Sequence, residues 1–164
     1  NDYIQTNVSG SDALTFTAWA KPAPSQSQYA GIIQRDVDSY LYDAVLRTYD
    51  SSWSFAIHDG SSWQPVRTSY IADSWQHVVT TYSEGEAKIY VDGVLKNTLN
   101  VSKLGDTVER VFIGRYYDPG SIDAYFDGEL SEIRTYNRSL TKSEVQYLYN
   151  VGKRGLHTTS KKSS

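Results

Sequence analysis

The sequence predicts an all-β fold in which two antiparallel sheets form a sandwich, followed by one short helix. Three observations carry this prediction: short runs in which apolar and polar residues alternate, turn residues at intervals of about ten positions, and one capped amphipathic segment near the carboxyl end. The chain has 164 residues, which is the usual size of one domain with a single core. We therefore expect one sandwich domain.

Two runs of the sequence define the expected core most clearly, residues 14–20 and 53–57. Because side chains alternate between the two faces of a strand, every second residue of each run faces the same side. These residues are apolar, and we expect them in the core: Leu14, Phe16, Ala18, Ala20, Trp53, Phe55 and Ile57. Further along, Asp92 and Gly93 stand between two strand-like runs, and this pair is a strong signal for a tight hairpin turn.

One helix is expected, beginning near Thr141. Thr141 and Glu144 have the spacing of a capping box, in which each side chain bonds the backbone N–H of the other residue. Leu140 can pack on Val145 across the helix start. Gly152 stands where a glycine often ends a helix, so we predict a short helix that ends there.

Residues 153–164 are predicted to be a basic and serine-rich tail or linker, which gives a domain over residues 1–152. The one basic cluster of the sequence lies in this tail and the net charge is -3, so the composition offers no surface for nucleic acid. The sequence has no cysteine and no apolar run of about 18 residues, so we expect neither disulfides nor membrane insertion. The absence of methionine suggests a processed chain or an excised domain.

Five blocks of the sequence together resemble a known family. They are NDYI at 1–4, LTFTAWAKP at 14–22, WQHVVTTY at 75–82, KIYVDG at 88–93 and FDGELSEIRTYNRSLT at 126–141. In this order they resemble the LamG-like jelly roll, the laminin-G branch of the concanavalin A-like lectin/glucanase superfamily, from residue 1 to about residue 152. The resemblance implies a jelly-roll sandwich, and because this fold carries many functions, it leaves the ligand open.

The same superfamily includes glycoside hydrolases, which carry two carboxylates on one strand face, typically as Glu-x-Asp-x-x-Glu. The sequence has no such motif. Glu84 and Glu86 fall at a predicted hairpin tip. Glu129 and Glu132 are three positions apart, so a regular strand would point them to opposite faces. We therefore predict that the chain is not an enzyme.

Trp19 and His77 belong to the family-like blocks and fall with the outer residues of their strands. One interpretation is that they form the aromatic and polar floor of a ligand site. The other is that the indole covers the sheet while the imidazole bonds a neighbouring strand or loop. The sequence leaves both interpretations open.

The resemblance also implies a calcium ion, because laminin-G and related jelly rolls often bind one through carboxylates and backbone carbonyls. The candidate ligands are Asp36 and Asp38 in an expected loop, and Asp127 before the last strand. Ser131 stands where family members commonly have an aspartate, which removes one candidate ligand. We expect Ca²⁺ as the candidate cofactor.

Tyrosine is over-represented, with 14 residues, and several fall in predicted loops, including Tyr49. A sugar site needs an aromatic platform beside polar groups that bond hydroxyls. The segment 115–125, predicted to be one long loop, offers this mixture in Arg115, Tyr116, Tyr117, Asp118, Asp123 and Tyr125. Alternatively, the tyrosines cover strands and sheet edges. Strand alternation indicates that Tyr116 and Tyr117 cannot both face the core.

We therefore expect a non-catalytic extracellular or cell-surface module that recognises carbohydrate or glycosylated surfaces, with calcium as a candidate ion. The alternative is a structural, assembly or adhesion domain of a cell-surface protein or filament, whose tyrosines contact a neighbouring copy or another protein. Segments 115–125 and 49–63 in one groove would favour sugar, whereas a flat apolar patch would favour a protein partner. Asn7, Asn100 and Asn137 are candidate N-glycan acceptors if the chain is secreted.

Overall fold

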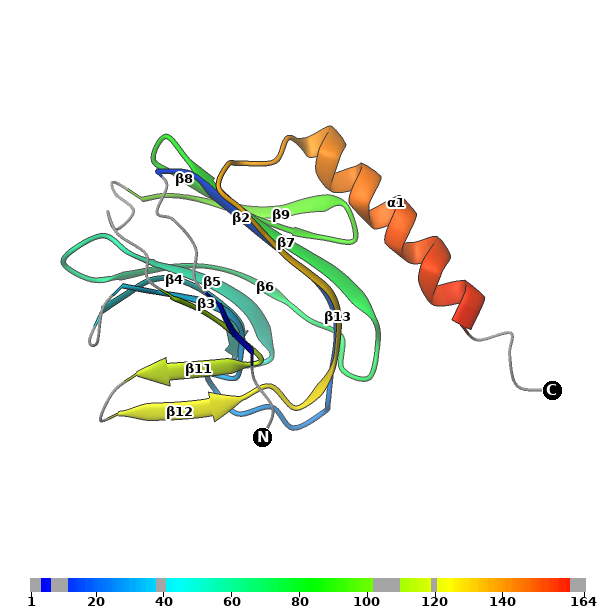
Figure 1. Ribbon diagram of the computed structural model, residues 1–164, viewed down its shortest axis with the longest axis horizontal. Coiled ribbons are helices and arrows are strands. Elements are labelled where there is room, and N and C mark those ends of the chain that lie inside the picture. The colour runs from blue at the N-terminus through cyan, green and yellow to red at the C-terminus, as the bar shows by residue number, and fades with distance from the viewer. Residues whose placement is uncertain (1–3, 7–11, 38–40, 102–109, 119–120, 160–164) are drawn as a thin grey trace.

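The computed structural model describes residues 4–6, 12–37, 41–101, 110–118 and 121–159, and it shows two sheets packed face to face with one helix outside them (Figure 1). The eight-stranded sheet contains β1 (Ile4–Thr6), β3 (Gly31–Val37), β4 (Leu41–Tyr49), β5 (Ser52–His58), β6 (Trp63–Ser69), β10 (Arg110–Ile113), β11 (Arg115–Asp118) and β12 (Ile122–Tyr125). The five-stranded sheet contains β2 (Leu14–Pro22), β7 (Gln76–Ser83), β8 (Glu86–Val91), β9 (Val94–Asn100) and β13 (Gly128–Tyr136). The helix α1 spans Lys142–Thr159. The predicted fold class, an all-β jelly-roll sandwich with one helix after the last strand, is confirmed.

Neighbouring strands run antiparallel in both sheets, with one exception among the described strands. The order is β1-β10-β3-β4-β5-β6 in the eight-stranded sheet and β13-β2-β7-β8-β9 in the five-stranded sheet. β11 and β12 form an antiparallel hairpin. The exception is the parallel contact of Tyr125 with Gly31, which joins this hairpin to β3 and which the sequence does not predict.

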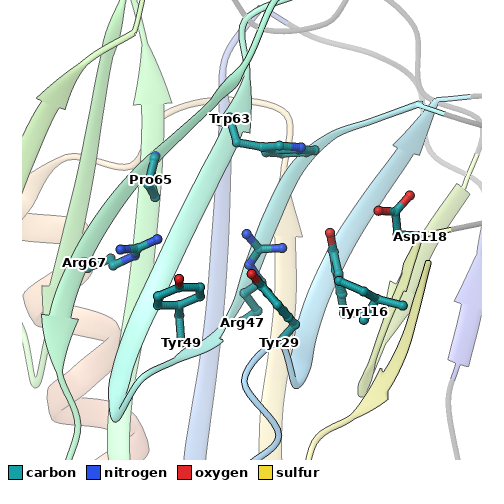
Figure 2. Close-up of a pocket in the computed structure, with 9 residues that line it drawn as sticks. Tyr29, Arg47, Tyr49, Trp63, Pro65, Arg67, Tyr116 and Asp118 are labelled. Carbon is teal, nitrogen blue, oxygen red and sulfur yellow. The ribbon is translucent and has the colours of Figure 1, made fainter.

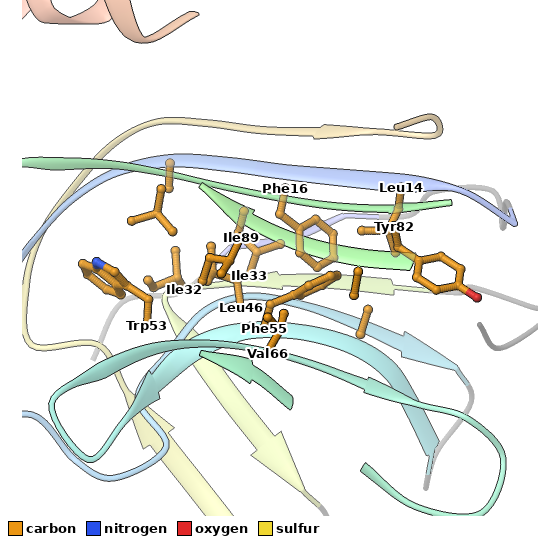
Figure 3. Close-up of a cluster of buried hydrophobic side chains, with 14 of the residues drawn as sticks. Leu14, Phe16, Ile32, Ile33, Leu46, Trp53, Phe55, Val66, Tyr82 and Ile89 are labelled. Atoms are coloured by element: carbon orange, nitrogen blue, oxygen red, sulfur yellow. The ribbon is translucent and has the colours of Figure 1, made fainter. Parts of the chain in front are cut away.

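The two sheets bury one apolar core between them (Figure 3). Phe16 of β2 and Phe55 of β5 meet edge to face across it, with ring centroids 6.0 Å apart. The indole N–H of Trp53 donates to the side-chain oxygen of Gln76 at 3.3 Å, so this large ring is buried with its donor paired. All seven residues that the alternation predicts for the core lie in it, namely Leu14, Phe16, Ala18, Ala20, Trp53, Phe55 and Ile57.

The predicted hairpin turn at Asp92 and Gly93 joins β8 to β9 and is confirmed. The φ angles of the two residues are 53° and 77°, and positive φ at both positions is what a tight type I′ turn requires. The turn is also bonded to β7. The backbone N–H of His77 donates to Asp92 Oδ1 at 2.9 Å, and the backbone N–H of Asp92 donates to the His77 carbonyl at 2.8 Å.

The start of α1 is as the sequence predicts. The backbone N–H of Thr141 donates to the Glu144 carboxylate at 2.8 Å, and the backbone N–H of Glu144 donates to the Thr141 hydroxyl at 3.3 Å, which forms a capping box. Leu140 and Val145 are buried in one apolar cluster beneath the helix. Two hydrogen bonds from Arg138 are the largest cause that lowers the pKa of Glu144 to about 2.

The predicted end of the helix is wrong, because α1 continues through Gly152 to Thr159. Gly152 is buried against the indole of Trp19, and a Cβ atom at this position would lie 2.1 Å from Trp19 Nε1. The glycine therefore allows a close contact and does not end the chain's helical path. Residues 153–159 of the predicted tail are helical, and residues 160–164 lie outside the described residues.

The helix α1 covers the outer face of the five-stranded sheet (Figure 1). Trp19 of β2 stacks on Tyr149 of the helix with ring centroids 5.7 Å apart, and it lies 5.1 Å from the His77 ring. Burial and, secondarily, the charge of Arg134 lower the pKa of His77 to about 4. The interpretation of Trp19 and His77 as the floor of a ligand site is wrong, because the helix occupies that face.

Candidate functional site

The eight-stranded sheet has a groove on the face that points away from the core (Figure 2). Leu46 of β4 and Val66 of β6 face the core, so the residues on either side of them in each strand face outward. The groove has a volume of about 340 Å³. Nine residues line it: Tyr29, Arg47, Tyr49, Trp63, Pro65, Arg67, Tyr116, Asp118 and Ile122.

Arg47 forms the centre of the groove floor and is 5% exposed. Its guanidinium carbon lies 4.7 Å from the centroid of the Tyr29 ring and 4.6 Å from that of the Tyr116 ring. The Trp63 ring centroid is 5.9 Å away. Aromatic faces attract a guanidinium cation, and stacking fixes the orientation of this planar group. The floor is therefore a packed layer of one cation and several rings.

Arg67 of β6 lies on the side of the groove opposite Asp118 (Figure 2). Its guanidinium carbon is 3.9 Å from the centroid of the Tyr49 ring. Tyr49 in turn meets Tyr29 edge to face at 5.3 Å, which links this side to the floor. The Nε atom of Arg67 is buried, and it has no hydrogen-bond partner among the described residues. An aromatic ring therefore holds this cation in place.

The hairpin of β11 and β12 forms the other side of the groove, because it is fixed over β3. Gly31 makes room for the hairpin, since a Cβ atom there would lie 2.2 Å from the backbone carbon of Arg115. The side-chain amide of Gln34 acts as a strand edge: it donates to the Tyr117 carbonyl at 2.8 Å and accepts from the Tyr117 N–H at 2.8 Å. These contacts place the neighbouring residues Tyr116 and Asp118 at the groove.

The predicted long loop at 115–125 is wrong, because residues 115–118 pair with residues 122–125 as strands. The pairing divides the six predicted ligand residues between the two faces of the hairpin. Tyr116 and Asp118 lie on the face that lines the groove. The other four share the opposite face, and they are Arg115, Tyr117, Asp123 and Tyr125.

On that opposite face, the polar side chains bond one another. The guanidinium of Arg115 donates to the two carboxylate oxygens of Asp123 at 2.7 and 3.0 Å, and it lies 4.5 Å from the centroid of the Tyr117 ring. Tyr116 is 2% exposed and Tyr117 is half-buried, in agreement with the alternation argument. A role of the six predicted residues in ligand binding stays a prediction.

Of the three predicted calcium ligands, two fall within the described residues, Asp36 and Asp127. Asp36 is in β3 opposite Tyr42, and Asp38 lies outside the described residues. Asp127 is exposed, and its backbone N–H donates to Gln26 Oε1 at 3.1 Å. Within the ranges that the structure describes, no three His, Cys, Asp or Glu side chains are grouped as metal ligands would be. Calcium stays a prediction.

The carboxylates of β13 form exposed ion pairs. Glu129 lies 2.9 Å from Lys21 Nζ, and Glu132 lies 3.3 Å from a guanidinium nitrogen of Arg134. The register of β13 shifts between Ser131 and Arg134, so regular alternation does not decide how Glu129 and Glu132 point. The opposite orientation of Glu129 and Glu132, expected for a regular strand, therefore stays a prediction, and each carboxylate is exposed beside its own cation.

Two of the three candidate glycan acceptors lie at the surface. Asn100 at the end of β9 is exposed, and so is Asn137 between β13 and α1. Asn7 lies outside the described residues. Glycosylation of these asparagines stays a prediction.

Most of the groove is missed by reasoning from the sequence. The missed residues are Tyr29, Arg47, Trp63, Pro65 and Arg67. The available signal is a spacing of two, which puts Trp63, Pro65 and Arg67 on one face of a strand. The sequence does not reveal that β4 and β6 flank the same strand, or which outer face the helix covers.

A family model described as the concanavalin A-like lectin/glucanases superfamily matches residues 1–146. A curated relative, adhesion G-protein coupled receptor V1 of Danio rerio, is 24% identical over 160 residues. That match covers 90% of this chain but 2% of the receptor, so the chain spans a small part of the relative's length. Within the described residues, no helix is both long and apolar enough to cross a membrane.

Solved structures share the fold at low sequence identity. A SAP-like pentraxin from Limulus polyphemus has a TM-score of 0.73 at 18% identity, over 90% of this chain and 75% of its own. Domain 4 of AbnA, an extracellular arabinanase from Geobacillus stearothermophilus solved with arabinotriose, has a TM-score of 0.72 at 20% identity, over 85% and 68%. Botulinum neurotoxin type C, whose cell entry depends on interaction with two ganglioside molecules, has a TM-score of 0.69 at 14% identity, over 91% and 39%.

Proposed function

The chain belongs to the concanavalin A-like lectin/glucanase superfamily, and from this premise we propose that it is a non-catalytic module that binds carbohydrate in the groove of the eight-stranded sheet. The observation that carries the proposal is the combination of aromatic rings and charged side chains around one space of about 340 Å³. Sites for small ligands are typically concave and mostly apolar, with a few placed polar groups.

The residues of the groove suit the chemistry of a sugar, which has apolar C–H faces and a rim of hydroxyls. Trp63 and Tyr49 are partly exposed and can pack against such faces. Arg67 and Asp118 stand on opposite sides of the groove, where they can donate to and accept from hydroxyl groups (Figure 2). Segments 49–63 and 115–125 thus contribute to one groove, which is the arrangement that favours sugar over a protein partner.

Two similar proteins support carbohydrate as the ligand, and a third supports a place at the cell surface. The arabinanase domain was solved with arabinotriose, and the type C neurotoxin interacts with gangliosides. The relative among the curated proteins is an adhesion receptor. We therefore place the module outside the cell or at its surface, with carbohydrate or a glycoprotein as the partner and with calcium as a candidate ion.

The variant Trp63→Ala tests the proposal on a glycan array, followed by calorimetric titration of the strongest glycan. Loss of the indole platform should weaken binding by about 1 kcal/mol or more, which is about fivefold. Tyr147→Ala is the matched control, because Tyr147 is an aromatic residue of α1 that is 67% exposed on the side of the molecule away from the groove. Running the array with and without EDTA separates binding that needs calcium.

Two outcomes would contradict the proposal in different ways. Equal glycan binding by the native chain and by folded Trp63→Ala would move the site away from the groove. No glycan binding by the native chain under either condition would favour the alternative, a structural or adhesion domain that makes protein contacts.

A further inference from the structure

We infer that the groove selects an acidic sugar, one that carries a carboxylate or a sulfate ester, and that Arg67 binds this anionic group. The inference rests on the proposed function, because it names the class of carbohydrate that the same groove takes. Three features support it: the guanidinium of Arg67, which has no ion pair among the described residues, the separation of charge across the groove, and the spacing of side chains along β6.

Arg67 has a positive charge that no described residue balances in an ion pair. Its Nε is buried without a hydrogen-bond partner, and its guanidinium is in no ion pair among the described residues. A charged group that is partly withdrawn from water requires a counter-charge or hydrogen-bond partners. The ring of Tyr49, 3.9 Å away, contacts the face of the guanidinium. Stacking leaves the in-plane N–H groups for a ligand, and these groups bind carboxylate or sulfate in pairs.

The charges of the groove are separated in space. Arg67 lies on one side, Arg47 lies in the floor, and Asp118 lies on the far side (Figure 2). Asp118 is the one acidic side chain among the described residues that line the groove. An anionic group is therefore attracted toward Arg67 and repelled from the side of Asp118. This polarity orients an acidic sugar in the groove, whereas a neutral sugar would leave Arg67 without a counter-charge.

The spacing along β6 suits a short oligosaccharide. Trp63, Pro65 and Arg67 occupy alternate positions of one strand, so all three face the groove. Arg67 follows Trp63 by four positions along the strand, so their Cα atoms are about 13 Å apart. This backbone span suits a ligand of more than one sugar ring. An acidic peptide could pair with Arg67, but it presents apolar ring faces to Trp63 only where proline or an aromatic residue stands near the acid.

The test uses an array in which each glycan core is present in three forms: neutral, with the carboxylate of a uronic or sialic acid, and with a sulfate ester. We expect the acidic forms of a bound core to bind at least about tenfold more tightly than the neutral form. The carboxylate and sulfate forms show which group supplies the anion. Binding of the acidic form should also weaken when salt is raised to about 0.5 M.

Substitutions at Arg67 assign the effect to this side chain. Arg67→Gln should abolish the preference for the acidic form, so that the acidic and neutral forms of the core bind within about threefold of each other. Arg67→Lys should restore part of the preference, because it keeps the charge but loses the planar fork. Arg154→Gln is the control, because it removes the same charge from the exposed surface of α1. It should leave the preference for the acidic form unchanged. Thermal melting of each variant confirms that it is folded.

The outcomes separate this inference from the proposed function. Glycan binding that requires Trp63 but is equal for neutral and acidic forms would overturn the selection of an acidic sugar. It would still agree with the proposed function, which is carbohydrate binding in the groove. A preference for the acidic form that survives Arg67→Gln would overturn the role of Arg67. Absence of binding to every form would overturn both.

Discussion

On the outer face of the five-stranded sheet, Trp19 and His77 are each 3% exposed beneath α1, whereas on the outer face of the eight-stranded sheet Tyr49 and Trp63 are partly exposed beside a groove. Both faces therefore present large rings on outward positions of their strands. The first face uses them to attach a helix. The second leaves them where a ligand can reach them.

Each face also has buried side-chain nitrogens without hydrogen-bond partners among the described residues, and the two faces differ in what lies over these atoms. Beneath α1, Trp19 Nε1 and His77 Nδ1 are buried and have no hydrogen-bond partner in the part of the chain that the structure describes. Leaving such groups unpaired costs stability, which the packing of the helix must offset. In the groove, two arginines stack on tyrosine rings. An outward aromatic residue thus indicates a functional site only where no other element covers it.

The largest expected effect distinguishes the two faces by stability. Trp19→Ala should lower the free energy of unfolding by about 4 kcal/mol, because it leaves a cavity between β2 and α1. Trp63→Ala should lower it by less than half as much, since that ring is partly exposed. Urea denaturation followed by circular dichroism measures both. Similar losses in the two variants would mean that both rings are buried in the core. The contrast between a covered face and an open face would then be wrong.

The second effect is a loss of stability in acid, which we expect from His77 on the face that α1 covers. His77 has an ordinary pKa of 6.5, and burial lowers it to about 4 in the folded chain. Between these values the unfolded chain binds a proton that the folded chain does not, so stability falls as the pH is lowered through this window. If the pH falls through the whole window between the two pKa values, the free energy of unfolding decreases by roughly 3 kcal/mol.

His77→Phe supplies the control for this pH dependence. The variant keeps a ring beside Trp19 but cannot titrate, so its unfolding free energy should change less between about pH 7 and about pH 4.5. Urea titrations at the two pH values measure the difference between the native chain and the variant. An identical acid loss in both would show that other groups cause it.

The third effect concerns the two glycines of α1, for which we predict opposite signs. Gly152→Ala should destabilise the chain by about 2 kcal/mol, because its Cβ atom would overlap Trp19. At Gly155 the nearest atom to an added Cβ is Glu132 Oε1 at 3.8 Å, which is ordinary contact. Gly155→Ala should therefore stabilise the helix by up to about 1 kcal/mol. Thermal melting compares them, and stabilisation by both would contradict the close packing of α1.

Local signals in the sequence predict much of the fold. Alternation identifies the core positions of β2 and β5, and the turn at Asp92 and the capping box at Thr141 locate a hairpin and a helix start. These features depend on residues that are near one another in the chain. The helix end is predicted wrongly because the role of Gly152 depends on Trp19, which comes from a distant strand.

The candidate site is less predictable for the same reason. Tyr116 and Asp118 are identified from the sequence, but their neighbours Tyr29, Arg47 and Arg67 come from other strands of the sheet. Composition places the remaining predicted ligand residues in the same group, whereas strand pairing turns them to the other side of the hairpin. Which outer face stays open is decided by where α1 packs, and periodicity does not contain this information.

The central claim is that the ligand binds on the outer face that α1 leaves uncovered. Its most direct test is a titration of the labelled chain with the strongest glycan from the array, followed by amide chemical shifts in NMR spectra. We predict that the largest shifts fall in β4, β6 and β11, with α1 and β7 unchanged. Saturable shifts concentrated in α1 or β7, with β4 and β6 unchanged, would contradict the claim.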